Sequence, residues 1–349
     1  TVKELVHQLM DTVDPVKLHG YTPAQGEASV RQALADDLNR RYGTGYTADH
    51  FYLTAGAAGA LCCALSALGC PGDQFLTFAP YFPEYKVFVE SAGAQLVAVP
   101  ARLEDFQIDF AALEAALSPQ VKGVIINSPN NPTGVVYSQE TIRRLAQMLG
   151  EKSRAYGHPI WLISDEPYRE LLFTGTEETY PARFYDNTIT CYSFSKSLSL
   201  PGERIGYVVV PNEVADADTV IAGINVSNRT LGFVNAPSLI QLAVAECLEE
   251  KTDVAYYDKN RTRLYEALTG YGYTCIKPEG AFYMWVKSPD EDEDRFVEQA
   301  KKYHLILVKG GAFCWPGYVR IAYCVSYDTI ERSLPAFEKL AEEYQLSGK

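Results

Sequence analysis

Apolar residues along the first three quarters of the chain recur with two spacings, one typical of helices and one typical of buried strands. Residues 26–43 have apolar side chains at helical spacing and end at a glycine, and residues 138–157 repeat this pattern behind Ser138, a residue type that caps helices. Residues 121–127 (VKGVIIN) form instead a short, continuous apolar run. Further strand-like runs, separated by helical segments, are 51–55, 74–79, 95–100, 160–168, 188–195 and 204–210. This alternation predicts βαβ units, and therefore an α/β fold with a mostly parallel sheet and helices on both faces.

The pattern changes from residue 259 onward. Helical segments at 259–272, 291–303 and 328–345 are separated there by short strand-like runs at 280–286, 305–308 and 318–325. This mixture predicts a smaller α+β unit beside the larger one. We expect the large α/β unit to span 21–258 and the small unit to combine 1–20 with 259–349. Because the chain opens at Thr1 in a helical pattern without an initiator methionine, we also expect a natural segment to precede it.

Composition and charge narrow the classes of function. The 349 residues carry a net charge of −13, and no Lys/Arg cluster supplies the basic face that nucleic-acid binding needs. No apolar run reaches the ~18 residues of a membrane span. The eight cysteines include no CxxC pair and the five histidines no HExxH motif, so we expect free thiols, no metal site and a cytoplasmic protein.

Four polar features interrupt the apolar pattern, and three of them follow a predicted strand. They are the segment 128–134 (SPNNPTG), the segment 165–168 (DEPY), Lys196 in a serine-rich stretch, and Arg320 inside the run YVRIAYCV. Each has a structural explanation of its own, respectively a turn, a cap, a solvated lysine and a buried salt bridge. However, ligands of parallel sheets bind at the carboxyl ends of the strands, where such groups would meet.

The order and spacing of these groups are more specific than any one of them. The motif S-x-S-K-x-x-x-x-P-G-x-R-x-G runs from Ser193 to Gly206, with NNPTG and DEPY before it and Arg320 after it. In this order the residues resemble the class I/II aminotransferases, aspartate aminotransferase-like enzymes of fold type I that use pyridoxal 5′-phosphate. The resemblance covers nearly the whole chain, from Tyr21 to the last helix. It implies an enzyme that moves an amino group between an L-amino acid and a 2-oxo acid.

The resemblance also implies roles for the residues around the cofactor ring. Lys196 would form a Schiff base with the cofactor aldehyde, and would then act as base and acid at the substrate Cα. Asp165 would keep the pyridine nitrogen protonated, since a neighbouring carboxylate raises the pKa of that nitrogen. Asn131 and Tyr168 would contact the phenolic oxygen of the ring.

The resemblance further implies a phosphate site, an aromatic side chain that stacks on the cofactor ring, and a contact from a second subunit. The phosphate would be bound by Ser193, Ser195, Arg204 and the backbone of Gly56, Ala57 and Ala58, where a predicted helix begins. Tyr21 would reach the phosphate of the partner subunit, so a homodimer is expected. Phe82 would stack on the ring, with Tyr81 as the alternative; Phe82 departs mildly from the Trp or Tyr that is usual there.

The substrate is indicated less clearly. Arg320 would bind the α-carboxylate as a bidentate donor, assisted by Asn131. Arg229, the only cation of residues 225–238, is either a surface residue or a ligand of a distal carboxylate in the partner's site. The second role would favour aspartate, glutamate and 2-oxoglutarate. β-C–S lyases and 1-aminocyclopropane-1-carboxylate synthases stay open as alternatives because they share the cofactor residues. An effector-binding domain of a transcription regulator is disfavoured, since the chain has no room for a DNA-binding domain.

Overall fold

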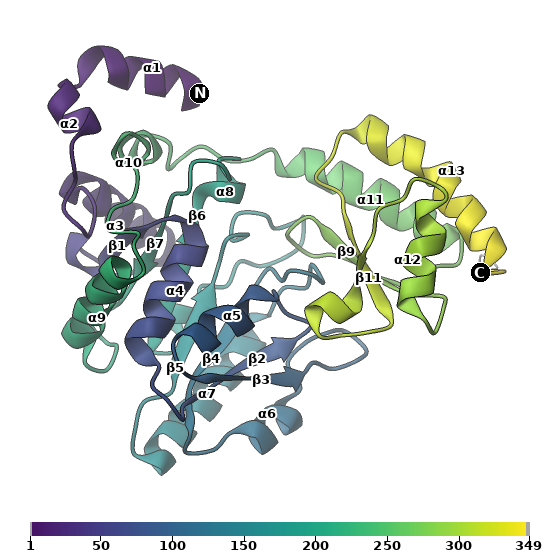
Figure 1. Ribbon diagram of the computed structural model, residues 1–349, viewed down its shortest axis with the longest axis horizontal. Coiled ribbons are helices and arrows are strands. Elements are labelled where there is room, and N and C mark those ends of the chain that lie inside the picture. The colour runs from purple at the N-terminus through teal and green to yellow at the C-terminus, as the bar shows by residue number, and fades with distance from the viewer. Residues whose placement is uncertain (1, 347–349) are drawn as a thin grey trace.

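A seven-stranded sheet forms the centre of the computed structural model, which describes residues 2–346 (Figure 1). From edge to edge its strands are β1 (Phe51–Thr54), β7 (Gly206–Val209), β6 (Thr188–Ser193), β5 (Trp161–Asp165), β4 (Val121–Asn127), β2 (Gln74–Ala79) and β3 (Gln95–Pro100). All of them are parallel except β7, which runs antiparallel to both of its neighbours. The mostly parallel sheet predicted from the sequence is therefore confirmed.

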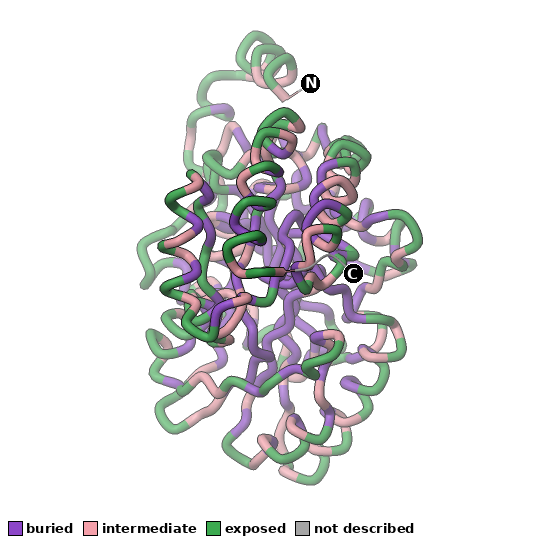
Figure 2. The backbone as a smooth tube through the Cα atoms, turned by 90° about the vertical axis from the view of Figure 1, so that its right-hand side faces the viewer, coloured by how far each residue is buried: buried purple, intermediate pink, exposed green. Residues whose placement is uncertain are grey.

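Helices cover both faces of this sheet, because successive residues of a strand point to opposite sides. The helices are α3 (Ala28–Tyr42), α4 (Gly56–Leu68), α5 (Glu84–Ser91), α6 (Phe110–Ala116), α7 (Gln139–Tyr156), α8 (Phe194–Ser197), α9 (Ala217–Thr230) and α10 (Ser238–Ala245). In β4, Val124 and Ile126 pack beneath α6 and α7, whereas Ile125 packs beneath α4, α5 and α9. Near β1, α3 and α10 extend the cover. Figure 2 shows that buried residues lie in the interior of the molecule and exposed residues along its outer surface.

Local sequence signals set the ends of these helices. α7 begins where Ser138 Oγ accepts the N–H of Thr141 at 3.1 Å, and it ends at Gly157, whose φ of 73° is left-handed. α3 ends in the same way at Gly43, with φ of 65°. Both boundaries agree with the sequence pattern. Within residues 2–346, no helix is long and apolar enough to cross a membrane.

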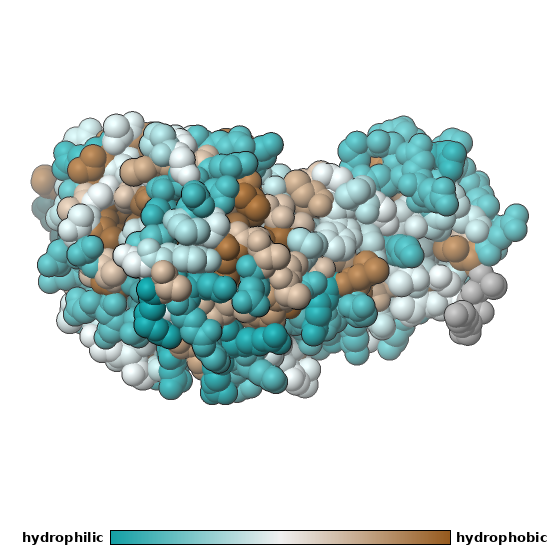
Figure 3. Space-filling view, turned by 90° about the horizontal axis from the view of Figure 1, so that it is seen from below, coloured by the Kyte–Doolittle hydropathy of each residue, from teal (hydrophilic) through white to brown (hydrophobic). Residues whose placement is uncertain are grey.

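The C-terminal part of the chain forms a second, antiparallel sheet of four strands. Its order is β10 (Val308–Lys309), β11 (Tyr318–Ala322), β9 (Tyr283–Lys287) and β8 (Cys275–Ile276). The helices α11 (Val254–Gly270), α12 (Glu293–Lys301) and α13 (Tyr327–Glu343) share an apolar core with it. In Figure 3 an indentation of the outline sets this part, on the right, apart from the larger part. Of the strand expected at 305–308, Leu305 and Leu307 pack in the core, and the pairing with β11 begins at Val308 and continues to Lys309.

The two N-terminal helices, α1 (Val2–Thr12) and α2 (Pro15–His19), contact α10. They lie at the end of the molecule opposite to α11, α12 and α13 (Figure 1). These contacts favour grouping α1 and α2 with the larger sheet. The division into a unit of 21–258 and a unit that joins 1–20 to 259–349 stays a prediction.

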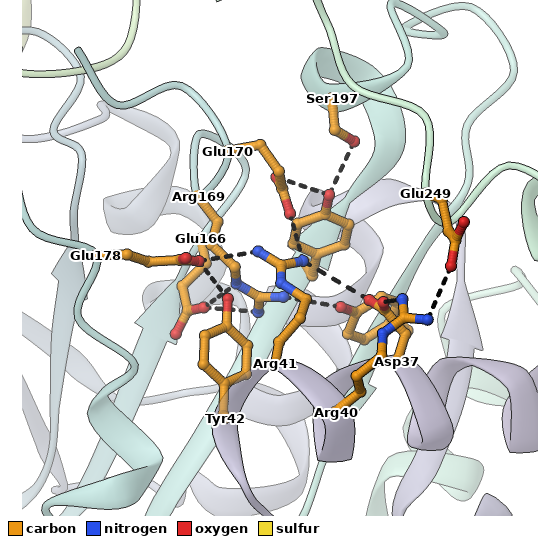
Figure 4. Close-up of polar contacts among 12 residues, drawn as sticks. Asp37, Arg40, Arg41, Tyr42, Glu166, Arg169, Glu170, Glu178, Ser197 and Glu249 are labelled. Atoms are coloured by element: carbon orange, nitrogen blue, oxygen red, sulfur yellow. Dashed lines mark hydrogen bonds and ion pairs between the residues drawn. The ribbon is translucent and has the colours of Figure 1, made fainter. Parts of the chain in front are cut away.

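A buried ionic network lies at the end of β5, next to α3 (Figure 4). The side chains of Glu166 and Arg169 form its centre; each is 3% exposed, and Arg169 Nε donates to Glu166 Oε2 at 2.6 Å. Arg169 Nη1 also donates to Tyr207 OH on β7 at 3.0 Å, and the guanidinium lies 4.5 Å from the ring centre of Tyr192 on β6. Because Glu166 directly follows Asp165, the network connects the end of β5 to its neighbour β6 and to β7 beyond it.

The neutral variant Glu166→Gln should destabilise the protein by about 3–5 kcal/mol, because it leaves the buried charge of Arg169 without a carboxylate. As a control, Glu249→Gln makes the same chemical change in an ion pair with Arg40 whose side chains are 82% and 58% exposed. This control should cost no more than about 1 kcal/mol. Urea unfolding followed by circular dichroism measures both, and equal midpoints for the two variants would contradict the expected role of the buried pair.

Candidate active site

Most of the predicted site residues surround one cavity at the carboxyl ends of β4, β5 and β6. Its volume is about 370 Å³, which is in the range of small-molecule sites. Asn127, Asp165 and Ser193 are the last residues of the three strands, and β11 of the second sheet contributes Arg320. The predicted residues that line the cavity are Ala57, Ala58, Phe82, Asn131, Asp165, Tyr168, Ser193, Ser195, Lys196, Arg204 and Arg320.

Lys196 reaches the cavity from α8, the short helix that follows β6. Ser193 caps this helix, since its Oγ accepts the N–H of Ser195 at 3.1 Å. Burial lowers the pKa of the Lys196 ammonium, and the positive charges of Arg204 and Arg320 lower it further. A larger fraction of the side chain is therefore the neutral amine, which is the form that acts as nucleophile and base.

Asp165 is buried at the end of β5, and only one of its two carboxylate oxygens is hydrogen-bonded among the described residues. Tyr85 OH donates to Oδ2 at 2.5 Å, whereas Oδ1 has no partner. Burial raises the pKa of Asp165 to about 7, and the charge of Glu166 adds to the rise. A protonated ring nitrogen beside Oδ1 would supply the missing donor and favour the carboxylate form. The residue therefore fits the pyridine nitrogen of pyridoxal phosphate.

Arg204 and the first turn of α4 form an anion site. The Arg204 guanidinium is held by two backbone carbonyls of neighbouring loops, at 3.0 and 3.4 Å. Gly56 needs to lack a side chain, because its φ is +73° and a Cβ would lie 2.8 Å from Arg204 Nη2. The first N–H groups of α4 have no partner within the helix. Together with the hydroxyls of Ser193 and Ser195, which lie 2.7 Å apart, these donors fit the cofactor phosphate.

Arg320 provides a second cationic group, oriented by partners on three sides. It lies on β11 opposite Trp285 of β9, and its Nη1 donates to Asn131 Oδ1 at 2.8 Å. The guanidinium carbon lies 4.4 Å from the ring centre of Tyr283 and 4.8 Å from that of Phe313. Its Nε is buried without a hydrogen-bond partner in the described structure. Arg320 thus keeps donors for a carboxylate ligand.

The sequence pattern did not identify three residues of this site. Tyr283 lines the cavity and its hydroxyl lies 3.1 Å from that of Tyr168. Tyr85 is the donor to Asp165 described above. Asn127 Nδ2 donates to the backbone carbonyl of Asp165 at 2.9 Å. The strand-end position of Asn127 was a usable signal, whereas nothing local distinguishes the two tyrosines from the others among the 24 in the chain.

Two further predictions concern the ring face and the partner subunit. Phe82 lines the cavity, whereas Tyr81 is 5% exposed and packs against Tyr85, so Phe82 is the better candidate for the ring face. Tyr21 is 96% exposed and Arg229 lies exposed at the end of α9; neither lines the cavity. Both were expected to act in the cavity of a second subunit, so a single chain leaves their roles as predictions.

Comparison with known families agrees with the geometry. The family model for aminotransferase class I and II matches residues 1–337. The aspartate/prephenate aminotransferase of Thermus thermophilus is 31% identical over 332 residues, which are 92% of this chain and 83% of that protein. The aspartate aminotransferase of Thermotoga maritima is 31% identical over 326 residues, with shares of 91% and 82%.

Solved structures give the same result. An amino transferase from Eubacterium rectale superposes with a TM-score of 0.96 and 50% identity, covering 98% of this chain and 86% of the other. The Thermus thermophilus aspartate aminotransferase with maleate has a TM-score of 0.86 and 29% identity, with shares of 97% and 87%. These relatives are all named aminotransferases, which favours amino transfer over the lyase and regulator alternatives. The chain therefore belongs to the class I and II aminotransferases, and it is an enzyme that depends on pyridoxal 5′-phosphate.

Proposed function

We propose that the enzyme exchanges amino groups between a dicarboxylic L-amino acid, aspartate or glutamate, and a 2-oxo acid. Lys196, with a lowered pKa, and Arg320, with unused donors, line the same cavity and support transfer of an α-amino group. The observation that carries the choice of a dicarboxylic substrate is the exposed Arg229 at the end of α9. Bound pyridoxal phosphate supplies an aldehyde carbon that condenses with amines and a ring that withdraws electrons from the substrate Cα. Lys196 removes the Cα proton as general base and later returns a proton as general acid.

The remaining residues hold the substrate and the ring in place. Arg320 binds the α-carboxylate, and Asn131 orients Arg320 through the 2.8 Å hydrogen bond. Because that bond uses Asn131 Oδ1, the Nδ2 group is left to donate to the phenolic oxygen of the ring. Tyr168 would donate to the same oxygen, and Asp165 would hold the protonated ring nitrogen through its charge.

A distal carboxylate needs a cation that this chain's own cavity does not supply. Among the described residues, the cations that line the cavity are Lys196, Arg204 and Arg320, and each already has a role. Arg229 is exposed at the end of α9, and no carboxylate within residues 2–346 lies in ion-pair distance of it. We therefore assign Arg229 to the distal carboxylate in the cavity of a second subunit of a homodimer, with the exposed Tyr21 reaching the phosphate there. The relatives named aspartate aminotransferases, and the Thermus enzyme with the dicarboxylate maleate, support this substrate class.

Arg229→Gln should lower kcat/KM for aspartate by about 10- to 100-fold and leave kcat/KM for an aromatic amino acid within about twofold. The expected loss is that of one charge-assisted hydrogen bond, about 1.5–3 kcal/mol. Steady-state kinetics with both donors measure it. The control is Arg332→Gln, which removes an arginine with a 79% exposed side chain on α13 and should leave both donors unaffected. Equal losses for the two donors, or a monomer in sedimentation velocity, would contradict the assignment.

A further inference from the structure

Tyr283 lies between the two groups of the cavity that are proposed to touch cofactor and substrate. It is the first residue of β9 and is 8% exposed. Trp285 of the same strand pairs with Arg320 of β11. Since residues two apart on a strand share a face, and paired residues of antiparallel strands do as well, Tyr283 is a diagonal neighbour of Arg320 on the side of the cavity.

The two ends of the Tyr283 side chain have different contacts. Its hydroxyl lies 3.1 Å from the hydroxyl of Tyr168, and its ring centre lies 4.4 Å from the guanidinium carbon of Arg320. Among the described residues, the contact between the two hydroxyls is the one hydrogen bond that each of them makes. One aromatic side chain thus touches both a group assigned to the cofactor and the group assigned to the substrate carboxylate.

We infer that Tyr283 is a positioning residue with two separable actions: its hydroxyl directs the proton of Tyr168 toward the cofactor, and its ring fixes the plane of the Arg320 guanidinium. A phenol has one hydrogen to donate. If Tyr283 donates to Tyr168, the hydrogen of Tyr168 is free for the phenolic oxygen of the ring. Burial raises the pKa of both phenols, so both hydroxyls carry their hydrogens at neutral pH.

The ring acts through packing and electrostatics. A guanidinium over an aromatic face is attracted by the negative face of the ring, and it is also restricted in rotation. Nη1 of Arg320 is already fixed by Asn131, so the rings of Tyr283 and Phe313 restrict how the rest of the guanidinium is tilted. A bidentate pair with a carboxylate depends on this tilt, because both N–H groups need to face the two oxygens.

Two variants separate the two actions, and the holoenzyme is used for both. Tyr283→Phe removes the hydroxyl only. When the absorbance of the bound cofactor is titrated against pH, the midpoint should rise by about 0.5–1 pH unit. The reason is that a weaker hydrogen bond from Tyr168 stabilises the ionised phenolic oxygen less. Tyr283→Leu removes the ring as well, and should in addition raise the dissociation constant of maleate about 3- to 10-fold. Phe313→Leu is the matched control, since Phe313 also lies beside Arg320; it should weaken maleate binding without moving the titration midpoint.

A double-mutant cycle distinguishes positioning from a general structural effect. In a Tyr168→Phe background, Tyr283→Phe should no longer shift the midpoint, because the hydrogen that it directs is absent. A midpoint in Tyr283→Phe that matches the wild type, or a shift that persists in the Tyr168→Phe background, overturns the first action. Equal maleate affinities of Tyr283→Phe and Tyr283→Leu overturn the second. The inference rests on the proposed roles of Tyr168 and Arg320, but the titration needs no substrate, so its failure is distinguishable from a failure of the dicarboxylate assignment.

Discussion

Lys196→Ala should lower turnover by at least about 10⁴-fold, because it removes both the amine that condenses with the cofactor and the general base at Cα. Lys196→Arg should lower turnover by as much. Arginine keeps the positive charge but cannot be deprotonated in a protein, so it can serve neither as nucleophile nor as base. The comparison therefore separates the need for a neutral amine from the need for a charge, and the lowered pKa of Lys196 agrees with the first. Turnover is measured with saturating donor and acceptor.

A second measurement identifies the lysine without relying on activity. Borohydride reduction of the wild-type holoenzyme converts the C=N bond into a stable C–N bond, and the peptide that carries Lys196 should gain the mass of the reduced cofactor. Neither variant should show this gain. The control is Lys287→Ala, at the exposed end of β9, which should keep both turnover and the labelled peptide. A labelled peptide from any other part of the chain would refute the assignment of Lys196.

Arg320→Gln should lower kcat/KM by about 10²- to 10⁴-fold, with the cofactor still bound. Two charge-assisted hydrogen bonds to the substrate carboxylate are lost, each of about 1.5–3 kcal/mol. Arg320→Lys should recover only a small part of the loss. A lysine keeps the charge but not the planar fork of donors, and it cannot bind Asn131 and a carboxylate in the same geometry. Steady-state kinetics of the three proteins give the order of effects.

A substrate without the α-carboxylate provides the most specific control for the role of Arg320. An amine substrate that lacks the α-carboxylate should react slowly with the wild-type enzyme, and Arg320→Gln should not slow it further. A comparable loss for this amine would show that Arg320 acts on the cofactor or on the fold instead. Arg263→Gln, in an ion pair between α11 and α13 whose side chains are 39% and 38% exposed, serves as the reference for substituting an arginine in the C-terminal part of the chain.

Much of the site could be predicted because its chemistry is concentrated in short segments. Ser193, Lys196 and Arg204 come from one stretch that turns from β6 through α8 toward β7, so their spacing reflects local geometry. Asp165 could be found from its place at the end of an apolar run. The layers of the fold followed from the same runs, because strands buried on both faces have no polar side to interrupt them.

The rest depends on contacts between distant segments. The apolar run of β7 contains no information about its direction, and it runs antiparallel because it returns directly to β6 after the α8 segment. Tyr85 and Tyr283 acquire their roles from partners 80 and 115 residues away in the chain, Asp165 and Tyr168 respectively. An aromatic residue in an apolar run packs in the core in most cases, and its hydroxyl becomes informative only when the tertiary partner is known.

The unused donors of Arg320 have a consequence for how substrates arrive. The whole chain carries a net charge of −13, whereas Arg320 presents a positive charge to the cavity. An anionic amino or oxo acid is therefore repelled at long range and attracted only near the entrance. Dissolved salt screens exposed charges over about 8–10 Å but acts much less on buried ones. Salt near physiological strength thus weakens the long-range repulsion of the substrate more than it weakens the attraction at the site. The rate at which anionic substrates reach the cavity therefore depends on ionic strength.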